Sequence, residues 1–237
     1  MVHLSVNINK IALIRNARGA NLPDINRIAI DCERYGAQGI TVHPRPDQRH
    51  IRFDDLDSLK KILTTEFNIE GYPSRQFIDL VCAVKPAQVT LVPDPPDALT
   101  SSAGWDTVKH QRFLCDVISE FQKNDIRTSI FIDPDSAMIE QAAATGTNRV
   151  ELYTESYARQ YQKNREEAIS PYIIAAKTAV NSGLGLNAGH DLNLDNLAFF
   201  NKNIPGLLEV SIGHALVCDA LYFGLQNTIG MYLQQLR

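Results

Sequence analysis

Six polar or ionisable side chains in this sequence directly follow short apolar runs. These side chains are Asn7, His43, Glu70, Glu151, His190 and His214. Short runs rich in apolar and β-branched residues are typical of buried strands, so we expect the six at strand ends. In a closed barrel of parallel strands, all the carboxyl ends open onto one mouth, where residues far apart in the sequence share a pocket. The pattern therefore predicts an enzyme with its active site at that mouth.

Residues 41–52, TVHPRPDQRHIR, form a basic segment after one of the expected strands. His43 and His50 suit proton transfer, and the planar guanidinium group of Arg45 suits a pair of phosphate oxygens. A basic loop is often only a solvated surface, but two histidines at a barrel mouth favour a functional interpretation. We therefore take His43, Arg45 and His50 as candidate site residues.

Two glutamates also lie at expected strand ends. Glu70, in NIEGYP, is costly to bury unless it is paired or used, and partial burial raises a carboxyl pKa toward the range of a general base. The alternative for Glu70 is a salt-bridged structural carboxylate. Glu151 has Arg149 and Tyr153 as nearby structural partners, so a structural and a functional role are equally favoured for it.

The last two expected strands both end in Gly-His, in LNAGHD and VSIGHA. Glycine permits close approach of the backbone, and the amides that begin the helices after the last barrel strands commonly bind phosphate. We therefore expect His190, Gly213 and His214 to line the pocket, with a phosphate near Gly213.

The stretch NINKIALIRNARG opens the mouth after the first strand. Asn7 and Asn9 lie two residues apart, so both would point into the pocket if the strand continued. Lys10 lies beyond the strand, where a solvated cation is favoured over a lysine that forms a Schiff base. Arg15 and Arg18 are either surface charges or an anion clamp, and Arg18 is the stronger candidate for the clamp.

The elements that would position these groups alternate along the chain as β-rich apolar runs and amphipathic stretches. Strands are predicted at 3–8, 38–42, 67–70, 88–92, 127–132, 148–152, 184–188 and 207–212. Helices are predicted at 23–35, 54–65, 74–84, 107–124, 135–145, 165–181, 193–202 and 215–236. Such alternation is typical of βα units with a parallel sheet. We predict an α/β fold, a single TIM (β/α)8 barrel domain over residues 1–237 with extra helical segments.

Local signals support these helices. Pro23 suits a first helical position, and Asp54 and Asp55 suit a first turn because the helix dipole favours negative charge there. Three glycines follow the helical periodicity where a left-handed residue commonly ends a helix: Gly36, Gly146 and Gly183. The competing fold, a doubly wound open sheet, would carry GxGxxG after its first strand, and this sequence has none there.

The composition argues against several classes of function. A formal net charge of -4 over 237 residues is not that of a general nucleic-acid binder. No run approaches the ~18 apolar residues of a membrane span, and the start lacks the pattern of a signal peptide. The four cysteines have no CxxC spacing, which indicates reduced, buried thiols in a cytoplasmic protein. The candidate ligands show no HxH or HExxH spacing, so we expect no metal.

Longer stretches match a known set of motifs, in order and over nearly the whole chain: VNINKIALIRNARG, GITVHPRPDQRHI, NIE, LVPD with Thr100, SIFID, LGLNAGH and IGHA. Together they resemble the pyridoxine 5′-phosphate synthase family of the deoxyxylulose-dependent vitamin B6 pathway. The resemblance implies a barrel enzyme that condenses 3-amino-2-oxopropyl phosphate with 1-deoxy-D-xylulose 5-phosphate. The implied products are pyridoxine 5′-phosphate, inorganic phosphate and water. It also implies a cytoplasmic homo-octamer without metal or organic cofactor.

The resemblance also implies roles for individual residues. His43 and Glu70 would act as general bases and His190 as a general acid. The amino-ketone phosphate would be held by Asn7, Arg18, Gly213 and His214, and Glu151 is a further substrate-binding candidate. The deoxyxylulose phosphate would be held by Arg45, His50 and Thr100.

The chain departs from the commoner family residues at Asn9, Lys10 and Asp191, and also at Pro44 and Pro46. Asn9 and Lys10 stand where Asp-His is common, and they still suit the deoxyxylulose phosphate although a proton-transfer role is lost. Asp191 replaces a glycine, and a carboxylate beside a phosphate-binding amide is repulsive unless it points away, although its own amide can still bind substrate. The long segment 93–106, tipped by Trp105, is predicted to act as a lid that excludes water.

Two other functions remain open on the residues alone. A phosphosugar aldolase or isomerase on the same barrel would make Lys10 or a metal essential. A non-catalytic protein that binds phosphorylated metabolites would need no proton-transfer groups, so His43→Ala would leave its binding intact.

Overall fold

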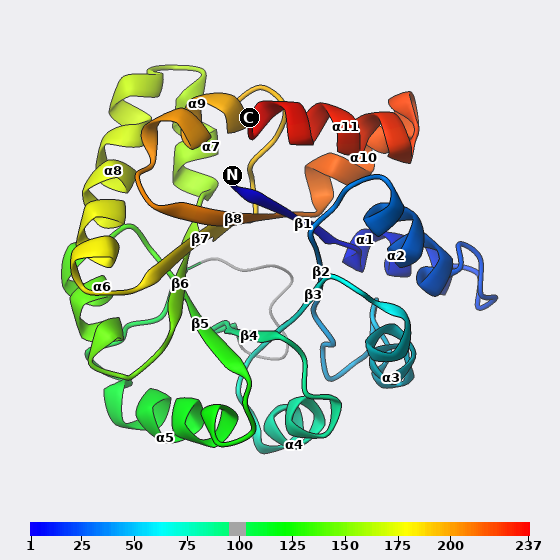
Figure 1. The fold of residues 1–237 in the computed structure, drawn as a ribbon, viewed down its shortest axis with the longest axis horizontal. Helices are drawn as coiled ribbons and strands as arrows, with labels where there is room; N and C mark the ends of the chain where they lie inside the picture. The colour runs from blue at the N-terminus through cyan, green and yellow to red at the C-terminus, as the bar shows by residue number, and fades with distance from the viewer. Residues whose placement is uncertain (95–102) are drawn as a thin grey trace.

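Eight parallel strands close into a barrel in the computed structural model, which describes residues 1–94 and 103–237. The strands are β1 (His3–Asn7), β2 (Gly39–Val42), β3 (Glu66–Gly71), β4 (Gln88–Leu91), β5 (Arg127–Ile132), β6 (Arg149–Tyr153), β7 (Gly185–Gly189) and β8 (Leu207–Ile212). Each strand pairs in parallel with the next, and β8 pairs with β1 to close the ring (Figure 1). The predicted TIM barrel is confirmed.

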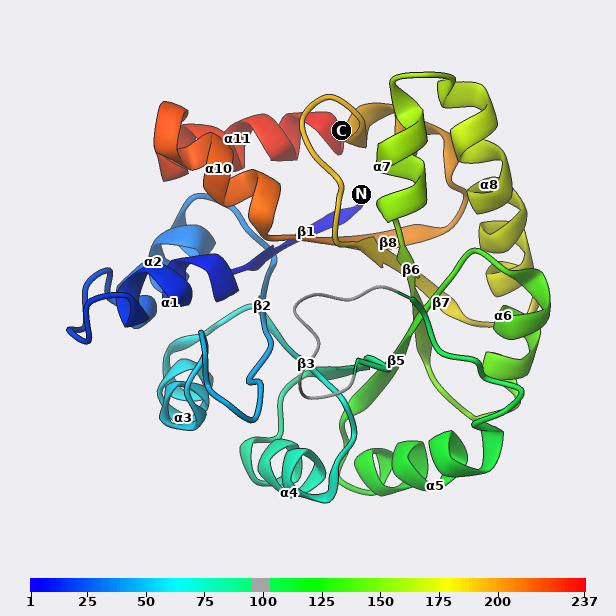
Figure 2. The same cartoon turned by 180° about the vertical axis from the view of Figure 1, so that it is seen from behind.

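Helices surround the strands, as the two opposite views show (Figures 1 and 2). They are α1 (Asn9–Asn16), α2 (Ile25–Arg34), α3 (Phe53–Ile62), α4 (Arg75–Val84), α5 (Gln111–Gln122), α6 (Ser136–Ala143), α7 (Glu155–Tyr161), α8 (Arg165–Asn181), α9 (Leu197–Asn203), α10 (His214–Phe223) and α11 (Leu225–Gln235). Because this layer covers the outer face, the strands are shielded from water on both faces, and every residue of β2 and β4 is buried.

A row of polar side chains crosses the inside of the barrel. Ser5 Oγ lies 2.7 Å from Thr41 Oγ1, and Asn68 Nδ2 donates to the same Thr41 oxygen at 3.3 Å. Thr90 Oγ1 lies 3.1 Å from Asn68 Oδ1 and 3.5 Å from Glu151 Oε2. All five side chains are buried, and these hydrogen bonds compensate them for the loss of water. A polar layer therefore lies below the strand ends.

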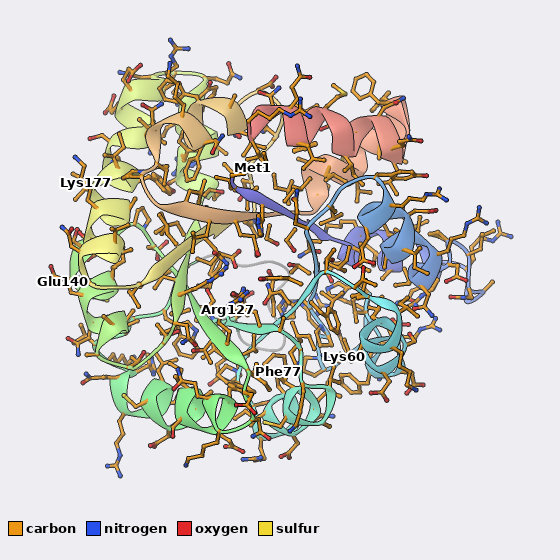
Figure 3. The ribbon with its side chains drawn as sticks, in the orientation of Figure 1. Met1, Lys60, Phe77, Arg127, Glu140 and Lys177 are labelled. Carbon is orange, nitrogen blue, oxygen red and sulfur yellow. The ribbon has the colours of Figure 1, made fainter. Side chains whose placement is uncertain are left out.

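Charged side chains lie both on the outer surface of the helices and at the amino ends of the strands. Figure 3 shows Glu140 and Lys177 on the outer helices α6 and α8, directed away from the barrel. Arg127, at the first position of β5, instead forms an ion pair with Glu66 at the start of β3. That pair lies at the amino ends of the strands, opposite the mouth, where side chains serve stability rather than catalysis.

Within the described ranges, no helix has the length and apolar character needed to cross a membrane.

Local turn chemistry explains where the helices begin and end. The three predicted helix-ending glycines all have a positive φ: Gly36 (106°), Gly146 (83°) and Gly183 (75°). Asp54 and Asp55 lie in the first turn of α3, as predicted. Pro23 is not the first residue of α2, because Asp24 caps that helix by accepting hydrogen bonds from the amides of Asn26 (2.9 Å) and Arg27 (3.3 Å).

Three further differences concern helices. The first strand ends at Asn7 rather than at residue 8, and α1, which was not predicted, begins at Asn9, so Asn7 and Asn9 do not alternate along one strand. The helix α7 was not predicted, because its seven residues are too few to show a clear apolar periodicity. The helix predicted at 215–236 is two helices, since Gly224 adopts a φ of 77° between α10 and α11.

Candidate active site

Several candidate residues meet at the carboxyl ends of the strands. Asn7 ends β1, Glu70 lies one residue before the end of β3, and His43 and His190 directly follow β2 and β7. Asn7 Nδ2 donates to Glu70 Oε2 at 3.4 Å, and the charge of His190 acts on Glu70. The backbone amide of His43 donates to Asn9 Oδ1 at 2.9 Å. Side chains from opposite halves of the chain therefore share one mouth.

Glu70 has the electrostatic setting of a base that works near neutral pH. Burial raises the pKa of its carboxyl group to about 7. The positive charge of His190 opposes this rise, and the negative charge of Asp94 adds to it. A carboxyl group with such a pKa is present in both protonation states near pH 7, which suits transfer of a proton.

Glu151 lies deeper in the barrel and is only 3% exposed. Burial, followed by the negative charge of Glu70, raises the pKa of its carboxyl group well above the usual value. Arg149, one of its two suggested structural partners, donates instead to Asn187 Oδ1 at 3.2 Å. Its surroundings therefore favour the protonated form of Glu151, and the Arg149 guanidinium hydrogen-bonds to Asn187.

His43 and His50 lie edge to face, with ring centroids 6.1 Å apart. Burial, and then the positive charge of Arg45, lower the pKa of His43 well below its usual value. The same two causes lower the pKa of His50 to about 4, and its Nδ1 accepts a hydrogen bond from the Ile51 amide at 3.0 Å. Both rings are neutral at pH 7, and a neutral imidazole can accept a proton.

His190 is electrostatically the opposite of His43. Burial alone would lower the pKa of its imidazole, but a hydrogen bond with Asp191 and the charge of that carboxylate raise it. The distance from His190 Nδ1 to Asp191 Oδ2 is 2.5 Å, and the His190 ring meets Tyr153 edge-on at 5.2 Å between centroids. The Asp191 carboxylate thus points to the imidazole, and the Asp191 amide donates to Thr154 Oγ1 at 3.3 Å.

The helix start after β8 is a site suited to an anion. Gly213 is the N-cap of α10, and His214 is its first residue. The first amides of a helix lack partners within the helix, and the helix dipole favours negative charge there. A Cβ atom at Gly213 would lie 3.0 Å from Asn7 Cβ, so Asn7 packs directly against this turn. The structure brings Asn7, Gly213 and His214 together, with the His214 side chain exposed.

Arg45 forms a buried ion pair that the sequence argument missed. Its Nη2 atom lies 3.2 Å from Asp94 Oδ2, and the two side chains are 6% and 4% exposed. The sequence signal was a carboxylate just after the fourth strand, in LVPD. Arg45 therefore lies at the mouth but has a carboxylate partner in this structure. Thr100 lies outside the described residues.

The cations near α1 have different surroundings. Lys10 is exposed in the first turn of α1, and Arg18 is exposed in the turn beyond the far end of that helix. Arg15 is only 1% exposed and binds Asp55 through two hydrogen bonds of 2.6 and 2.8 Å. It also donates to the His50 carbonyl at 3.0 Å. Arg15 is therefore neither a surface charge nor an anion clamp, because it holds the basic segment 41–52 in place.

Trp105 does not tip a lid. Its side chain is 4% exposed, its Nε1 donates to the Leu91 carbonyl at 3.1 Å, and its ring stacks on Tyr72 with centroids 5.9 Å apart. A large indole packed and hydrogen-bonded in this way anchors its segment to the barrel. The prediction is wrong for Trp105, and residues 95–102 of the expected lid lie outside the described part of the chain.

A pocket opens beside the basic segment. Its polar wall includes His43, Arg45 and Asp94, and its apolar wall includes Tyr72 and Phe77. A small molecule in this pocket would contact His43 and Arg45 directly. Within residues 1–94 and 103–237, no three His, Cys, Asp or Glu side chains are arranged to hold a metal ion.

Comparison with known proteins gives matches over the whole chain. The family model described as pyridoxal phosphate biosynthesis protein PdxJ matches residues 4–237. Proteins named pyridoxine 5′-phosphate synthase are 63% identical to this chain in Cytophaga hutchinsonii and 62% identical in Flavobacterium johnsoniae. Both matches extend over 237 residues, which is 100% of this chain and of each relative.

Solved structures with the same fold are much less similar in sequence. Phosphoribosyl anthranilate isomerase from Thermotoga maritima has a TM-score of 0.62 at 12% identity, covering 100% of this chain and 98% of that one. Tryptophan synthase from M. tuberculosis has a TM-score of 0.64 at 11% identity, covering 100% and 94%. Identities this low show the barrel fold alone.

Proposed function

The chain belongs to the PdxJ family of pyridoxal phosphate biosynthesis proteins, and from this membership we propose how its barrel mouth performs the reaction. It is an enzyme that makes pyridoxine 5′-phosphate. The proposed substrates are 3-amino-2-oxopropyl phosphate and 1-deoxy-D-xylulose 5-phosphate, with inorganic phosphate and water as the other products. Joining an amine to a ketone and closing a ring requires several separate proton transfers.

The proposed general acid and general bases differ in how their surroundings shift their pKa values. His43 is neutral and Glu70 is partly ionised at pH 7, so we assign these two as general bases. His190 has a raised pKa and is the general acid. Neighbouring titratable groups whose surroundings push their pKa values in opposite directions can serve as acid and base at one pH. This separation is the observation that carries the proposal, and each such transfer typically contributes ~10²–10⁴-fold in rate.

The two phosphates are assigned to different parts of the mouth, one at the end of β8 and the other beyond β2. The amino-ketone phosphate would bind the Gly213 and His214 amides at the start of α10, beside Asn7. Arg18 and Asp191 remain candidate contacts from the family resemblance, although Arg18 is exposed beyond α1 and the Asp191 amide already donates to Thr154.

The deoxyxylulose phosphate is assigned to the basic segment. Arg45, His50, Asn9 and Lys10 would hold it, together with Thr100. Because Arg45 is paired with Asp94, a phosphate must either displace the Asp94 carboxylate or share the Arg45 guanidinium group with it. Glu151, kept neutral by burial, would donate a hydrogen bond to the reacting substrate. Holding both substrates in one pocket converts their encounter into an effectively intramolecular step.

Replacing the Glu70 carboxyl group tests the central assignment. Glu70→Gln keeps the shape of the side chain and removes the base, so formation of the pyridine ring, followed by its absorbance, should fall ~10²-fold or more. Both substrates should still bind in calorimetry. Glu140→Gln, an exposed change on α6, is the matched control and should leave turnover unchanged. Near-normal turnover of Glu70→Gln would refute the assignment.

Assembly and location are also proposals. Tyr222 (85% exposed), Leu221 (73%) and Phe223 (48%) end α10, and Leu13 and Ile14 are exposed on α1, which contacts α10. Such exposed apolar groups commonly lie in subunit contacts, which supports a homo-oligomer and, from the family resemblance, an octamer. Sedimentation of the pure protein measures this, and a monomer would contradict it.

The four free cysteines suit the cytoplasm, which fractionation of the expressing cell checks.

A further inference from the structure

The backbone that carries His190 is held in an unusual conformation. His190 has a φ of 98°, in the left-handed region that residues other than glycine seldom adopt. Its amide donates to the Ser211 carbonyl of β8 at 3.4 Å. Such a conformation persists only where the surrounding structure enforces it. The direction in which the imidazole leaves the backbone is therefore set by the junction of β7 and β8.

The next residue, Asp191, is held by hydrogen bonds at both its backbone amide and its backbone carbonyl. Its amide donates to Thr154 Oγ1 at 3.3 Å, and its carbonyl accepts from Asn196 Nδ2 at 3.4 Å. Thr154 is fully buried and in turn donates to the Gly189 carbonyl at 2.7 Å. These bonds fix the backbone of Asp191, so its carboxylate has a defined direction. That direction is toward His190 Nδ1, 2.5 Å away.

We propose that Asp191 is a positioning residue, which holds the His190 ring through Nδ1 so that Nε2 is the nitrogen that gives a proton to the substrate. The proposal rests on the assignment of His190 as general acid. A carboxylate that accepts from Nδ1 fixes both the orientation and the tautomer of an imidazole, and it stabilises the charged ring. Asp191 thus acts on the reaction through His190 and need not touch either substrate.

Other charged groups also face this ring. Glu70 of β3 and Asp94 beyond β4 favour the protonated imidazole through their charges, and Tyr153 of β6 presents a neutral ring to it. Asp191 differs from Glu70 and Asp94 because it acts through a hydrogen bond as well as through charge. Removing its charge alone should therefore change both the proton affinity of the ring and its orientation.

The decisive variant is Asp191→Asn, which keeps the size of the side chain and removes its charge. Asp195→Asn, an exposed change on the same segment, is the matched control for loss of one negative charge. Histidine labelled with ¹⁵N reports the titration of His190 by NMR. We expect Asp191→Asn to lower the pKa of His190 and to move the alkaline limb of the kcat profile to lower pH. Turnover at pH ~8 should fall ~10-fold or more, with the KM values much less affected.

The outcomes separate this proposal from the one on which it rests. An unchanged His190 titration in Asp191→Asn, with His190→Gln inactive, would overturn the role of Asp191 alone. Normal turnover of His190→Gln would overturn the acid assignment and the positioning role together. If Asp191→Asn fails to fold, the unaltered protein still decides the matter. Its neutral His190 must carry the proton on Nδ1, and a ring protonated on Nε2 would overturn the proposal.

Discussion

Replacing Gly189 with alanine tests how tightly β7 packs against Glu151 and against the backbone of β8. Gly189 ends β7 and pairs with Tyr153 and Ser211 of the neighbouring strands. A Cβ atom there would lie 2.6 Å from Glu151 Oε1 and 2.8 Å from the Ser211 carbonyl oxygen. The Ser211 oxygen belongs to the barrel backbone and also accepts from the His190 amide, so it cannot move without disturbing the mouth.

The expected size of the effect follows from these distances. Overpacking of this kind costs ~1–3 kcal/mol. In a chain of this length, 1 kcal/mol shifts the melting temperature by ~2–4 °C, so Gly189→Ala should melt ~2–12 °C lower. Displacement of Glu151 and His190 by a fraction of an ångström should also lower kcat by ~10-fold or more, because proton transfer depends steeply on geometry.

Calorimetry and ring-product absorbance measure the two effects, and the chain supplies a control. Gly230 lies inside α11, and a Cβ atom there meets nothing within 4 Å. Gly230→Ala should therefore raise the free energy of unfolding by ~0.5–1 kcal/mol and leave kcat unchanged. If Gly189→Ala had the melting temperature and kcat of the unaltered protein, the steric argument would be refuted.

Two further predictions concern Arg45 and pH. Arg45→Ala should raise KM for the deoxyxylulose phosphate more than KM for the amino-ketone phosphate, and equal losses for both would contradict the two-site layout. Its unfolding must be measured in parallel, since Asp94 is left buried without this cation. The kcat/KM profile should rise with pH through about 7, because Glu70 must lose its proton to act as a base. At higher pH the rate should fall as His190 loses the proton that it donates, and a rate independent of pH between ~6 and ~8 would contradict both roles.

Most of the fold could be predicted because its signals are local. The strands at 127–132 and 207–212 have the predicted bounds, since each is a short apolar run that ends at turn or polar residues. The break at Gly224 was missed because a single glycine is often tolerated inside a helix, so its positive φ could not be inferred from the residues around it. The short helix α7 was missed because it gives too few turns for a periodic signal.

For the site as well, features set by nearby residues could be predicted, and features set by contacts with distant residues could not. The types of the catalytic candidates and their places at strand ends were visible in the sequence, because a parallel barrel gathers all such ends at one mouth. Arg15, by contrast, was predicted to be either a surface charge or an anion clamp, and only its hydrogen bonds to Asp55, 40 residues away, show that it is structural. Trp105 looked like the tip of a loop until it was seen to pack on Tyr72.

The order of the strands and of most helices, and the chemical groups that stand at the strand ends, follow from the residues alone, because neighbours within a few positions decide both. The protonation of those groups does not. Glu70 and His43 depend on burial by other strands, and His190 depends on a carboxylate held in place by Thr154 and Asn196. Removal from water and the approach of distant charges set a pKa, and only the closed barrel supplies them.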